Sequence, residues 1–408
     1  MKEQITKSLF LEIKERSDKY ILGNYKRYEI AFEYGSGDLL YDLNGKEYID
    51  FQSGIAVTNL GHGEADIIES LRDQADKLIH TSNLFYSKEQ SLLAEAIIVN
   101  SFPGKVFLCN SGTEANEAAF KLARKFALSK KIESPVILSL KGSFHGRTSA
   151  AMMLTGQEKV RNGFGPMIPG FDYIEENNIQ SLESKFKEHK GKIAALILEP
   201  VLGEFGALPL TDEFLLSSRK ITAEEGAMFI LDEIQTGMGR TGKLFCYQHY
   251  PFYPDAMTLA KGLGSGFPIG ALVVGEKFTE YLTQGSHGST FGGNHLAAVV
   301  AYETLKVILG RELLVNLPPL SEFLFRRLRI LQAKFPSIIK EVRGRGLHIG
   351  LELNVLSRPI VEKCLEKGLI INSTNETMIR IMPPLTVSIE RIDDAMNIFE
   401  SVLFEYST

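Results

Sequence analysis

The sequence of 408 residues contains 45 Lys and Arg against 50 Asp and Glu, which gives a formal net charge of −5. This mild acidity, with no basic block in the chain, argues against a nucleic-acid partner. Hydrophobic residues make up 44% and charged residues 23%, which is typical of a globular protein with a large apolar core. The length predicts roughly two to three domains.

The cysteines and histidines indicate neither disulfides nor a metal site. Cys109, Cys246 and Cys364 are widely spaced, which is typical of a reducing compartment, and the eight histidines show no metal-ligand spacing. The first ten residues lack the apolar segment of a signal peptide. Apolar runs such as 193–198 are too short to cross a bilayer. We therefore expect a cytoplasmic protein without a metal, a nucleic-acid partner or a membrane partner.

The first segment in chain order, up to about residue 60, has the features of a hairpin. Residues 40–48 contain two apolar-rich runs around Asn44-Gly45, a pair that is typical of tight turns. We expect residues 1–60 to form an N-terminal segment that packs with the smaller, C-terminal domain.

The middle of the chain alternates short apolar runs with helical patterns. We expect strands at 136–140, 194–198, 228–231 and 271–274, and a helix over 114–130 with apolar residues on one face. Such alternation predicts an α/β domain whose mostly parallel sheet is covered by helices on both sides. We assign residues 61–305 to this large domain.

The last part of the chain has a different pattern. A long helix is expected around 297–309, followed by strands at 349–353 and 378–382 with helices between them. This pattern predicts a smaller α+β domain over residues 306–408.

Two reactive side chains follow apolar runs in the middle of the chain. Asp232 ends the run at 229–231, with Gln235 three residues later, and Lys261 follows the run at 258–260. A buried aspartate can keep a pyridine nitrogen protonated, and a lysine can bind an aldehyde as an imine and later carry a proton. Together they fit a pyridoxal phosphate site. Taken alone, the aspartate also fits a strand-end cap or metal ligand, and the lysine a solvated surface residue.

The segment 110–114 precedes the predicted helix and suits an anion. Backbone N–H groups at a helix start attract a phosphate, Gly112 permits close approach, and the hydroxyls of Ser111 and Thr113 can add hydrogen bonds. Ser111 and Glu114 also have the spacing of a capping box. The two interpretations are compatible, so we predict a capped helix start that binds phosphate.

Phe144 and Arg147 follow the predicted strand at 136–140. The aromatic ring can stack on a planar cofactor, and the guanidinium can bind a substrate carboxylate through two hydrogen bonds. The alternative is a core phenylalanine and a surface arginine. His145, between them, is the one histidine that we single out.

Residues 237–243 imitate two nucleotide-binding motifs. They fit G-x-x-x-x-G-K, but Leu244 stands where a Ser or Thr would bind magnesium. The same glycines spell G-x-G-x-x-G, but residues 243–251 lack the helical period that this fingerprint requires. A nucleotide triphosphatase and a nicotinamide enzyme are therefore disfavoured. A nucleotide-binding switch remains the rival from another class, and the yellow colour of a purified pyridoxal enzyme would exclude it.

Long motifs across residues 41–385 resemble the class III aminotransferases, which have the aspartate aminotransferase-like fold (fold type I). The motifs are Ser53–Val57 with Leu60–His62, Asn110–Glu117, Phe144–Thr148, Leu198–Val201, Leu231–Gly242, Thr258–Lys261, Phe267–Ala271 and His287–Asn294. The resemblance implies a pyridoxal phosphate enzyme with a seven-stranded, mostly parallel sheet. The chain departs from the usual pattern at His295, at 264–266 and at 63–65, none of which has a chemical role.

The resemblance implies specific contacts with the cofactor. Lys261 would bind its aldehyde, Asp232 its pyridinium nitrogen and Gln235 its phenolic oxygen. The remaining cofactor contacts would come from Ser111, Gly112, Thr113, Phe144, Glu233 and Ile234, and from Thr290 of the neighbouring subunit in a homodimer with shared active sites.

The resemblance also implies a ping-pong transamination between an amino donor and 2-oxoglutarate, as in arginine biosynthesis. Arg147 and Ser289 would face the substrate, and Glu204 and Arg380 would form a gate for its carboxylates. The expected donor is N2-acetyl-L-ornithine, with succinylornithine, ornithine and 4-aminobutyrate as alternatives and a further activity on succinyl-diaminopimelate left open. Ile55 stands where ornithine aminotransferases carry a tyrosine, which disfavours free ornithine.

Overall fold

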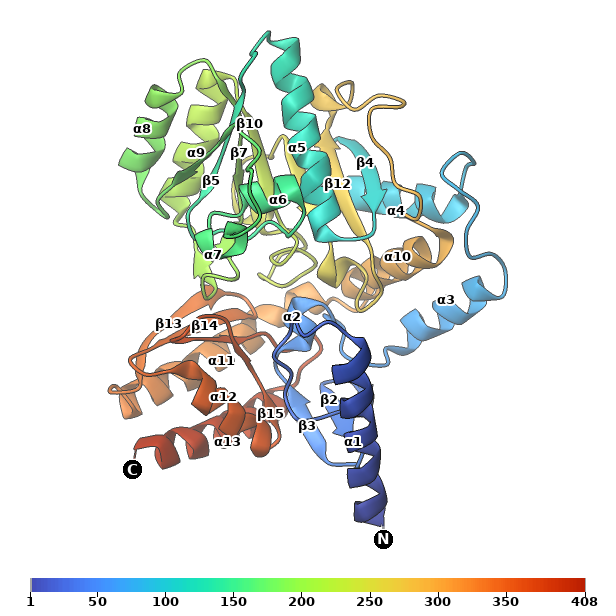
Figure 1. The fold of residues 1–408 in the computed structure, drawn as a ribbon, viewed down its shortest axis with the longest axis vertical. Coiled ribbons are helices and arrows are strands. Elements are labelled where there is room, and N and C mark those ends of the chain that lie inside the picture. The colour runs from blue at the N-terminus through green and yellow to red at the C-terminus, as the bar shows by residue number, and fades with distance from the viewer. Residues whose placement is uncertain (1, 408) are drawn as a thin grey trace.

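The computed structural model describes residues 2–407, and Figure 1 shows a large part above a smaller one. The large part contains a seven-stranded sheet with the strand order β4-β12-β11-β10-β7-β5-β6. Its strands are β4 (Gly104–Cys109), β5 (Val136–Leu140), β6 (Phe171–Ile174), β7 (Ile193–Leu198), β10 (Met228–Asp232), β11 (Ala256–Leu259) and β12 (Gly270–Gly275).

This sheet is parallel apart from one strand. Only β12 runs against its neighbours, since it pairs antiparallel with both β11 and β4, whereas the pairs formed by β5, β6, β7, β10 and β11 are parallel. Every residue of β7, β10 and β12 is buried, as expected for strands covered on both faces. The strands predicted at 136–140, 194–198, 228–231 and 271–274 and the mostly parallel sheet are confirmed.

Helices cover both faces of the sheet, with α5 and α6 on one side and α8 and α9 on the other (Figure 1). Successive residues of β7 point to opposite faces of the sheet. Ile197 packs with the buried hydrophobic residues of α5, and Leu196 packs with those of α8 and α9. The helices of this part are α3 (Ala65–Ala75), α4 (Lys88–Val99), α5 (Gly112–Ser129), α6 (Ser149–Leu154), α7 (Glu158–Arg161), α8 (Ile179–Glu188), α9 (Asp212–Glu225) and α10 (His295–Gly310).

The N-terminal strands share a sheet with the C-terminal end of the chain. β2 (Leu39–Asp42) and β3 (Glu47–Asp50) form the predicted antiparallel hairpin, with Gly45 at a positive φ in its turn. β1 (Phe32–Ser36) pairs with β2, and β3 pairs in parallel with β15 (Leu369–Ile370). The division of the chain into domains at residues 60 and 305 stays a prediction.

A second four-stranded sheet and three helices form the smaller part. The strands are β13 (Ile339–Arg345), β14 (His348–Leu353), β16 (Asn372–Ser373) and β17 (Met378–Ile381), and the helices are α11 (Leu313–Lys334), α12 (Ser357–Glu366) and α13 (Ile389–Ser407). The remaining elements are α1 (Lys2–Tyr20), α2 (Ser53–Ala56), the pair β8 (Val201–Leu202) and β9 (Leu208–Pro209), and the 3-10 turns Cys246–His249, Lys261–Leu263 and Glu276–Phe278. Within the described residues, no helix combines the length and apolar character that a membrane span needs.

The glycine-rich segment 237–242 does not open an α-helix. A single 3-10 turn follows it, and Arg240 at its centre is fully buried. The Arg240 guanidinium donates to the carbonyl oxygens of Leu347 and Pro383 and, at 2.7 Å, to Oδ1 of Asn59. The segment therefore ties the large part to the smaller part.

Candidate active site

A cavity of about 450 Å³ opens at the carboxyl ends of the parallel strands. This is the edge where α/β sheets bind ligands, and the volume lies within the roughly 300–1,000 Å³ of ligand pockets. Ten of the predicted site residues line it, namely Ser111, Gly112, Thr113, Phe144, Arg147, Glu204, Asp232, Ile234, Gln235 and Lys261, and so does His145.

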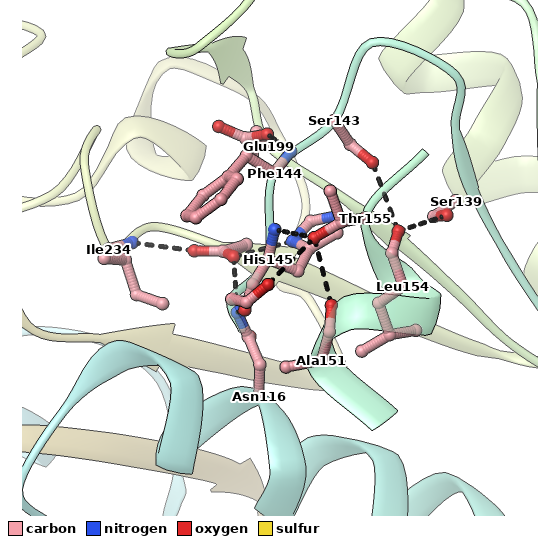
Figure 2. A network of polar contacts seen from close by, with 12 residues as sticks. Asn116, Ser139, Ser143, Phe144, His145, Ala151, Leu154, Thr155, Glu199 and Ile234 are labelled. Atoms are coloured by element: carbon pink, nitrogen blue, oxygen red, sulfur yellow. Dashed lines mark hydrogen bonds and ion pairs between the residues drawn. The ribbon is translucent and has the colours of Figure 1, made fainter. Parts of the chain in front are cut away.

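Asp232 lies at the end of β10, and both oxygens of its carboxylate take part in hydrogen bonds. Its Oδ2 accepts a hydrogen bond from Nδ2 of Asn116 and lies within hydrogen-bond distance of Nδ1 of His145, each at 2.7 Å. Its Oδ1 accepts from the Ile234 N–H at 3.0 Å. Figure 2 shows Asn116, His145 and Ile234 around this carboxylate, which carries no label. These contacts fix the orientation of the carboxylate, so it is positioned to accept a hydrogen bond from a protonated ring nitrogen.

Lys261 follows β11 at the start of a 3-10 turn, in the left-handed region with a φ of 47°. The side chain is partly accessible from the cavity. Burial lowers the pKa of Lys261, Glu204 opposes this shift, and Arg380 adds to it. Burial therefore shifts the equilibrium of this amine toward the neutral form, which is the form that reacts with an aldehyde or takes up a proton.

The start of α5 forms one end of the cavity and has the features that suit an anion. Ser111 caps the helix by accepting from the Glu114 N–H, so the predicted cap is confirmed. Glu114 accepts at 2.7 Å from the N–H of Asn110, one residue before the cap, so this second bond differs from that of a capping box. A Cβ on Gly112 would lie 2.7 Å from Cδ1 of Ile234. Glycine at this position therefore lets the helix start approach the floor of the cavity, where its free N–H groups suit a phosphate.

Phe144 and Arg147 stand on the loop after β5. The Phe144 N–H donates to Oε1 of Glu199 at 2.8 Å, which fixes the loop that presents the ring to the cavity. Arg147 is exposed at the cavity mouth, with its guanidinium 5.4 Å from the centre of the Phe144 ring. This is the arrangement that ring stacking and carboxylate binding require.

Glu204 and Arg380 meet although they lie far apart in the sequence. Nη1 of Arg380 lies 2.8 Å from Oε1 of Glu204 and also donates to Oε1 of Gln235 at 3.1 Å. Asn372 accepts two further bonds from the same guanidinium, which is almost fully buried. Burial raises the pKa of Glu204, but Arg380 and Lys261 outweigh burial, so the pKa lies below its ordinary value. The contact exists as the resemblance implied, and its role as a gate stays a prediction.

Besides Arg380, three predicted site residues do not line the cavity, namely Glu233, Ser289 and Thr290. Glu233 is buried with its carboxylate accepting from the N–H groups of Cys246 and Tyr247, and burial raises its pKa to about 7. That side chain therefore secures the following turn, and a side-chain contact with a cofactor does not fit its position. Oγ of Ser289 accepts from Nδ2 of Asn110 at 3.1 Å, and Thr290 is exposed.

Two buried polar residues at the site were not predicted as functional. Asn116 lies among alanines on the buried face of α5. A polar residue on an otherwise apolar helix face is the sequence feature that could have identified it. Glu199 follows the fully buried β7, lines the cavity, and accepts from the N–H groups of Phe144 and Gly203. Burial raises the pKa of Glu199 to about 7, with His145 opposing and Asp232 reinforcing that shift. The sequence feature that could have identified Glu199 is an acidic residue directly after a buried strand.

Two other features of the described residues are weaker candidates. A hollow of about 1,020 Å³ lies beside residues 26–31 and α12, but Lys26, Arg27 and Glu29 on its wall are exposed to solvent. Asp172, Glu188 and His189 bring three possible metal ligands together. Nζ of Lys185 already lies 2.7 Å from Asp172 and 2.9 Å from Glu188, so a protein cation balances these carboxylates.

Comparison with known proteins agrees with this geometry. The family profile described as "Aminotransferase class-III" matches residues 21–403. The acetylornithine aminotransferase of Caldanaerobacter subterraneus subsp. tengcongensis is 45% identical over 95% of this chain and 98% of its own length.

Solved structures of related enzymes share the fold. The ornithine aminotransferase of Toxoplasma gondii, in a structure with partial occupancy of PLP at the active site, superposes with a TM-score of 0.93 and is 31% identical over 98% of this chain and 95% of that chain. The acetylornithine aminotransferase of Elizabethkingia anophelis gives a TM-score of 0.88 at 33% identity, over 97% of this chain and 99% of that chain.

Proposed function

The chain belongs to the class III aminotransferases, and from this premise we propose that it transfers the terminal amino group of N2-acetyl-L-ornithine to 2-oxoglutarate. The products are N-acetyl-L-glutamate 5-semialdehyde and L-glutamate. The observation that carries the proposal is the ion pair that Arg380 forms with Glu204, a residue that lines the same cavity as Lys261. A pair that can break lets one site accept both N2-acetylated ornithine and glutamate. The names of the similar curated enzymes support the choice of donor.

Class III aminotransferases use pyridoxal phosphate, and the residues of the cavity fit it. Lys261 offers an amine whose pKa burial lowers, Asp232 a buried carboxylate, and the start of α5 a phosphate cradle in which a Cβ at position 112 would collide with Ile234. We assign Phe144 to one face of the ring and Gln235 to its phenolic oxygen. When bound, the cofactor supplies an aldehyde that receives the amino group and a ring that withdraws electrons from the substrate carbon.

The protein residues perform the proton transfers and the positioning. Asp232, held by Asn116 and His145, keeps a proton on the ring nitrogen. Nζ of Lys261, whose pKa burial lowers, would move the proton from the carbon that bears the substrate amine to the cofactor, and in the opposite direction in the reverse half-reaction. Arg147 at the mouth is placed for a carboxylate of either substrate.

We further propose a cytoplasmic homodimer with shared active sites. Leu84, Phe85 and Tyr86 expose large apolar side chains, with Tyr86 fully exposed, and Phe291 lies exposed beside Thr290. Nδ2 of Asn83 donates to the Ser289 carbonyl at 2.8 Å, which brings this apolar segment close to Thr290, the residue that by resemblance would contact the cofactor phosphate in the neighbouring subunit. An apolar patch of this kind is typical of an interface. The three buried, unpaired cysteines support a reducing compartment.

A panel of amino donors with 2-oxoglutarate tests the proposal. We expect kcat/KM for N2-acetyl-L-ornithine to exceed that for ornithine and 4-aminobutyrate by at least about tenfold, which corresponds to roughly 1.4 kcal/mol. N2-succinyl-L-ornithine and N-succinyl-diaminopimelate complete the panel. A higher kcat/KM for free ornithine would reassign the chain to the ornithine transaminases, whose Toxoplasma gondii member shares its fold closely.

A further inference from the structure

Residues 53–56 form a turn in a conformation that L-amino acids rarely adopt. Ser53, Gly54, Ile55 and Ala56 have φ values of 48°, 59°, 70° and 57°, so four consecutive residues are left-handed and three of them carry a Cβ. Backbone strain of this kind persists only where the surroundings enforce it, and it clusters at functional sites. The turn, α2, lies where the N-terminal strands meet the large and small parts (Figure 1).

The carboxylate of Asp50 holds the start of this turn. Its Oδ1 accepts from the N–H groups of Gln52 and Ser53, each at 2.9 Å, and its Oδ2 lies 2.8 Å from Nε2 of His62. Asp50 is buried at the end of β3. One side chain therefore fixes the backbone that enters the turn and the histidine that follows it.

The turn connects to the active site at two points. The Val57 N–H donates to the Ser53 carbonyl at 2.7 Å, and Val57 lines the cavity. Oγ of Ser53 donates to the carbonyl of Met382 at 2.8 Å, two residues after Arg380 on the chain. The position of the turn thus sets one wall of the cavity and contacts the segment that follows the arginine of the gate.

We propose that Asp50 is a positioning residue of this active site, which acts on substrate binding through the left-handed turn 53–56. Asp50 is not among the residues that line the cavity. It holds the Val57 wall in place before substrate arrives, so the binding energy of substrate is not used to order that wall. This role of Asp50 deepens the proposed function and depends on it only for the identity of the amino donor.

The Asp50→Asn variant, purified with its cofactor, tests the role. The substitution keeps the shape but replaces one of the two acceptor oxygens by a donor. We expect KM for the amino donor and for 2-oxoglutarate to rise about tenfold while kcat stays within about threefold, because a looser wall weakens ground-state and transition-state binding alike. Amide hydrogen exchange at residues 55 and 57 should accelerate in the same variant.

Asp42→Asn is a matched control in the same sheet. Asp42 is also buried, and its Oδ1 accepts from two backbone N–H groups, those of Asn44 and Lys46, while its Oδ2 accepts from the Tyr48 hydroxyl at 3.2 Å. It caps the hairpin turn, which does not line the active-site cavity. KM in this variant should stay within about twofold of wild type, since a loss of general stability alone does not weaken substrate binding to the folded enzyme.

Relief of the strain provides a second, independent test. Ala56→Gly places glycine at a φ of 57°, which glycine adopts without a steric penalty. In the Asp50→Asn background it should return KM to within about threefold of wild type. If Asp50→Asn does not fold, Ser53→Ala removes the bond to Met382 instead and should raise KM in the same way.

Three results would overturn the proposal: an unchanged KM in folded Asp50→Asn, an equal rise in Asp42→Asn, or a failure of Ala56→Gly to restore binding. Both half-reactions are measured. If the wild-type enzyme does not use N2-acetyl-L-ornithine, the proposed function fails, while the same variants assayed with glutamate and 2-oxoglutarate still decide the role of Asp50.

Discussion

The floor and the mouth of the active-site cavity are built in opposite ways. On the floor, Asp232, Asn116 and His145 are buried and bonded to one another within a single chain. At the mouth, Arg147 is exposed, and Thr290, outside the cavity, lies exposed on a segment beside an apolar patch. On the function proposed above, one chain supplies the groups for proton transfer, for the ring and, at the start of α5, for the phosphate, whereas Thr290 of a second subunit would add a further contact.

Electrostatics separates the same two regions. The floor places a carboxylate among fixed donors, so its charge is stabilised before any ligand arrives. The Glu204–Arg380 pair between floor and mouth is held by one direct contact at 2.8 Å, and Glu204 keeps a partly exposed side chain. A preorganised floor suits a step common to all substrates, and a breakable pair suits two substrates of different charge.

We expect the largest loss of turnover when Lys261 is removed from the floor of the cavity. Lys261→Ala should lower turnover by at least about 10⁴-fold, or roughly 5.5 kcal/mol of barrier, because no other lysine among the described residues lines the cavity. The fold, followed by circular dichroism, should persist. Borohydride reduction and peptide mapping of the wild type should attach the cofactor to Lys261, and attachment to a different lysine would refute the assignment. Lys243→Ala, at an exposed position, is the control.

Asp232→Asn tests whether the floor acts through charge. An amide cannot hold a proton on the ring nitrogen, although it can keep some of the bonds to Asn116 and His145. We expect the cofactor to remain bound and single-turnover rates to fall about 10³-fold, or roughly 4 kcal/mol. Rates within about tenfold of wild type would show that Asp232 only organises the loop after β10.

Much of the floor could be predicted from the sequence because its residues follow strands. Asp232 and Lys261 end or follow apolar runs, and parallel strands bring such ends together at one edge. The capped start of α5 was readable from the spacing of Ser111 and Glu114. Local pattern and sheet topology were enough for these residues.

Other features depend on contacts that no local pattern encodes. Arg380 reaches Glu204 across 176 positions of sequence, and only resemblance to a family suggested the pair. Glu233 adjoins Asp232 in sequence, yet it points to the turn at Cys246 because successive residues at a strand end face opposite ways. The left-handed turn at 53–56 contains only one glycine, so its sequence gave little sign of its backbone.

A negative charge at Thr290 should abolish activity if this residue contributes to the active site of the neighbouring subunit. Thr290→Asp should repel the phosphate and inactivate the homodimer, and Lys261→Ala inactivates it separately. After subunit exchange, a mixture of the two variants should regain about a quarter of wild-type activity, since half of the dimers would be mixed and each would hold one intact site. No recovery after exchange confirmed by mass spectrometry would show that each site is built from one chain.

We expect the smallest effect on rates from a change in the Glu204–Arg380 pair, which lies between the floor and the mouth. The donor carries no charge near its transferred amine, whereas glutamate carries an α-carboxylate beside its own. While paired, Glu204 neutralises Arg380, since Arg380 and Lys261 outweigh burial and keep the pKa of that carboxyl low. Separated, Arg380 is free to bind the α-carboxylate of glutamate, while Arg147 takes the distal carboxylate, and an unpaired buried charge is avoided in both cases.

Glu204→Gln removes this neutralisation and leaves Arg380 charged whichever substrate is bound. A charge-assisted hydrogen bond contributes roughly 1.5–3 kcal/mol, so the half-reaction with glutamate should gain on that with N2-acetyl-L-ornithine by about tenfold or more. Stopped-flow measurement of both half-reactions gives the ratio directly. Glu213→Gln, at an exposed position on α9, should leave the ratio unchanged. An unchanged ratio in Glu204→Gln would instead make the pair a fixed part of the floor, because only a pair that opens can discriminate between the two substrates.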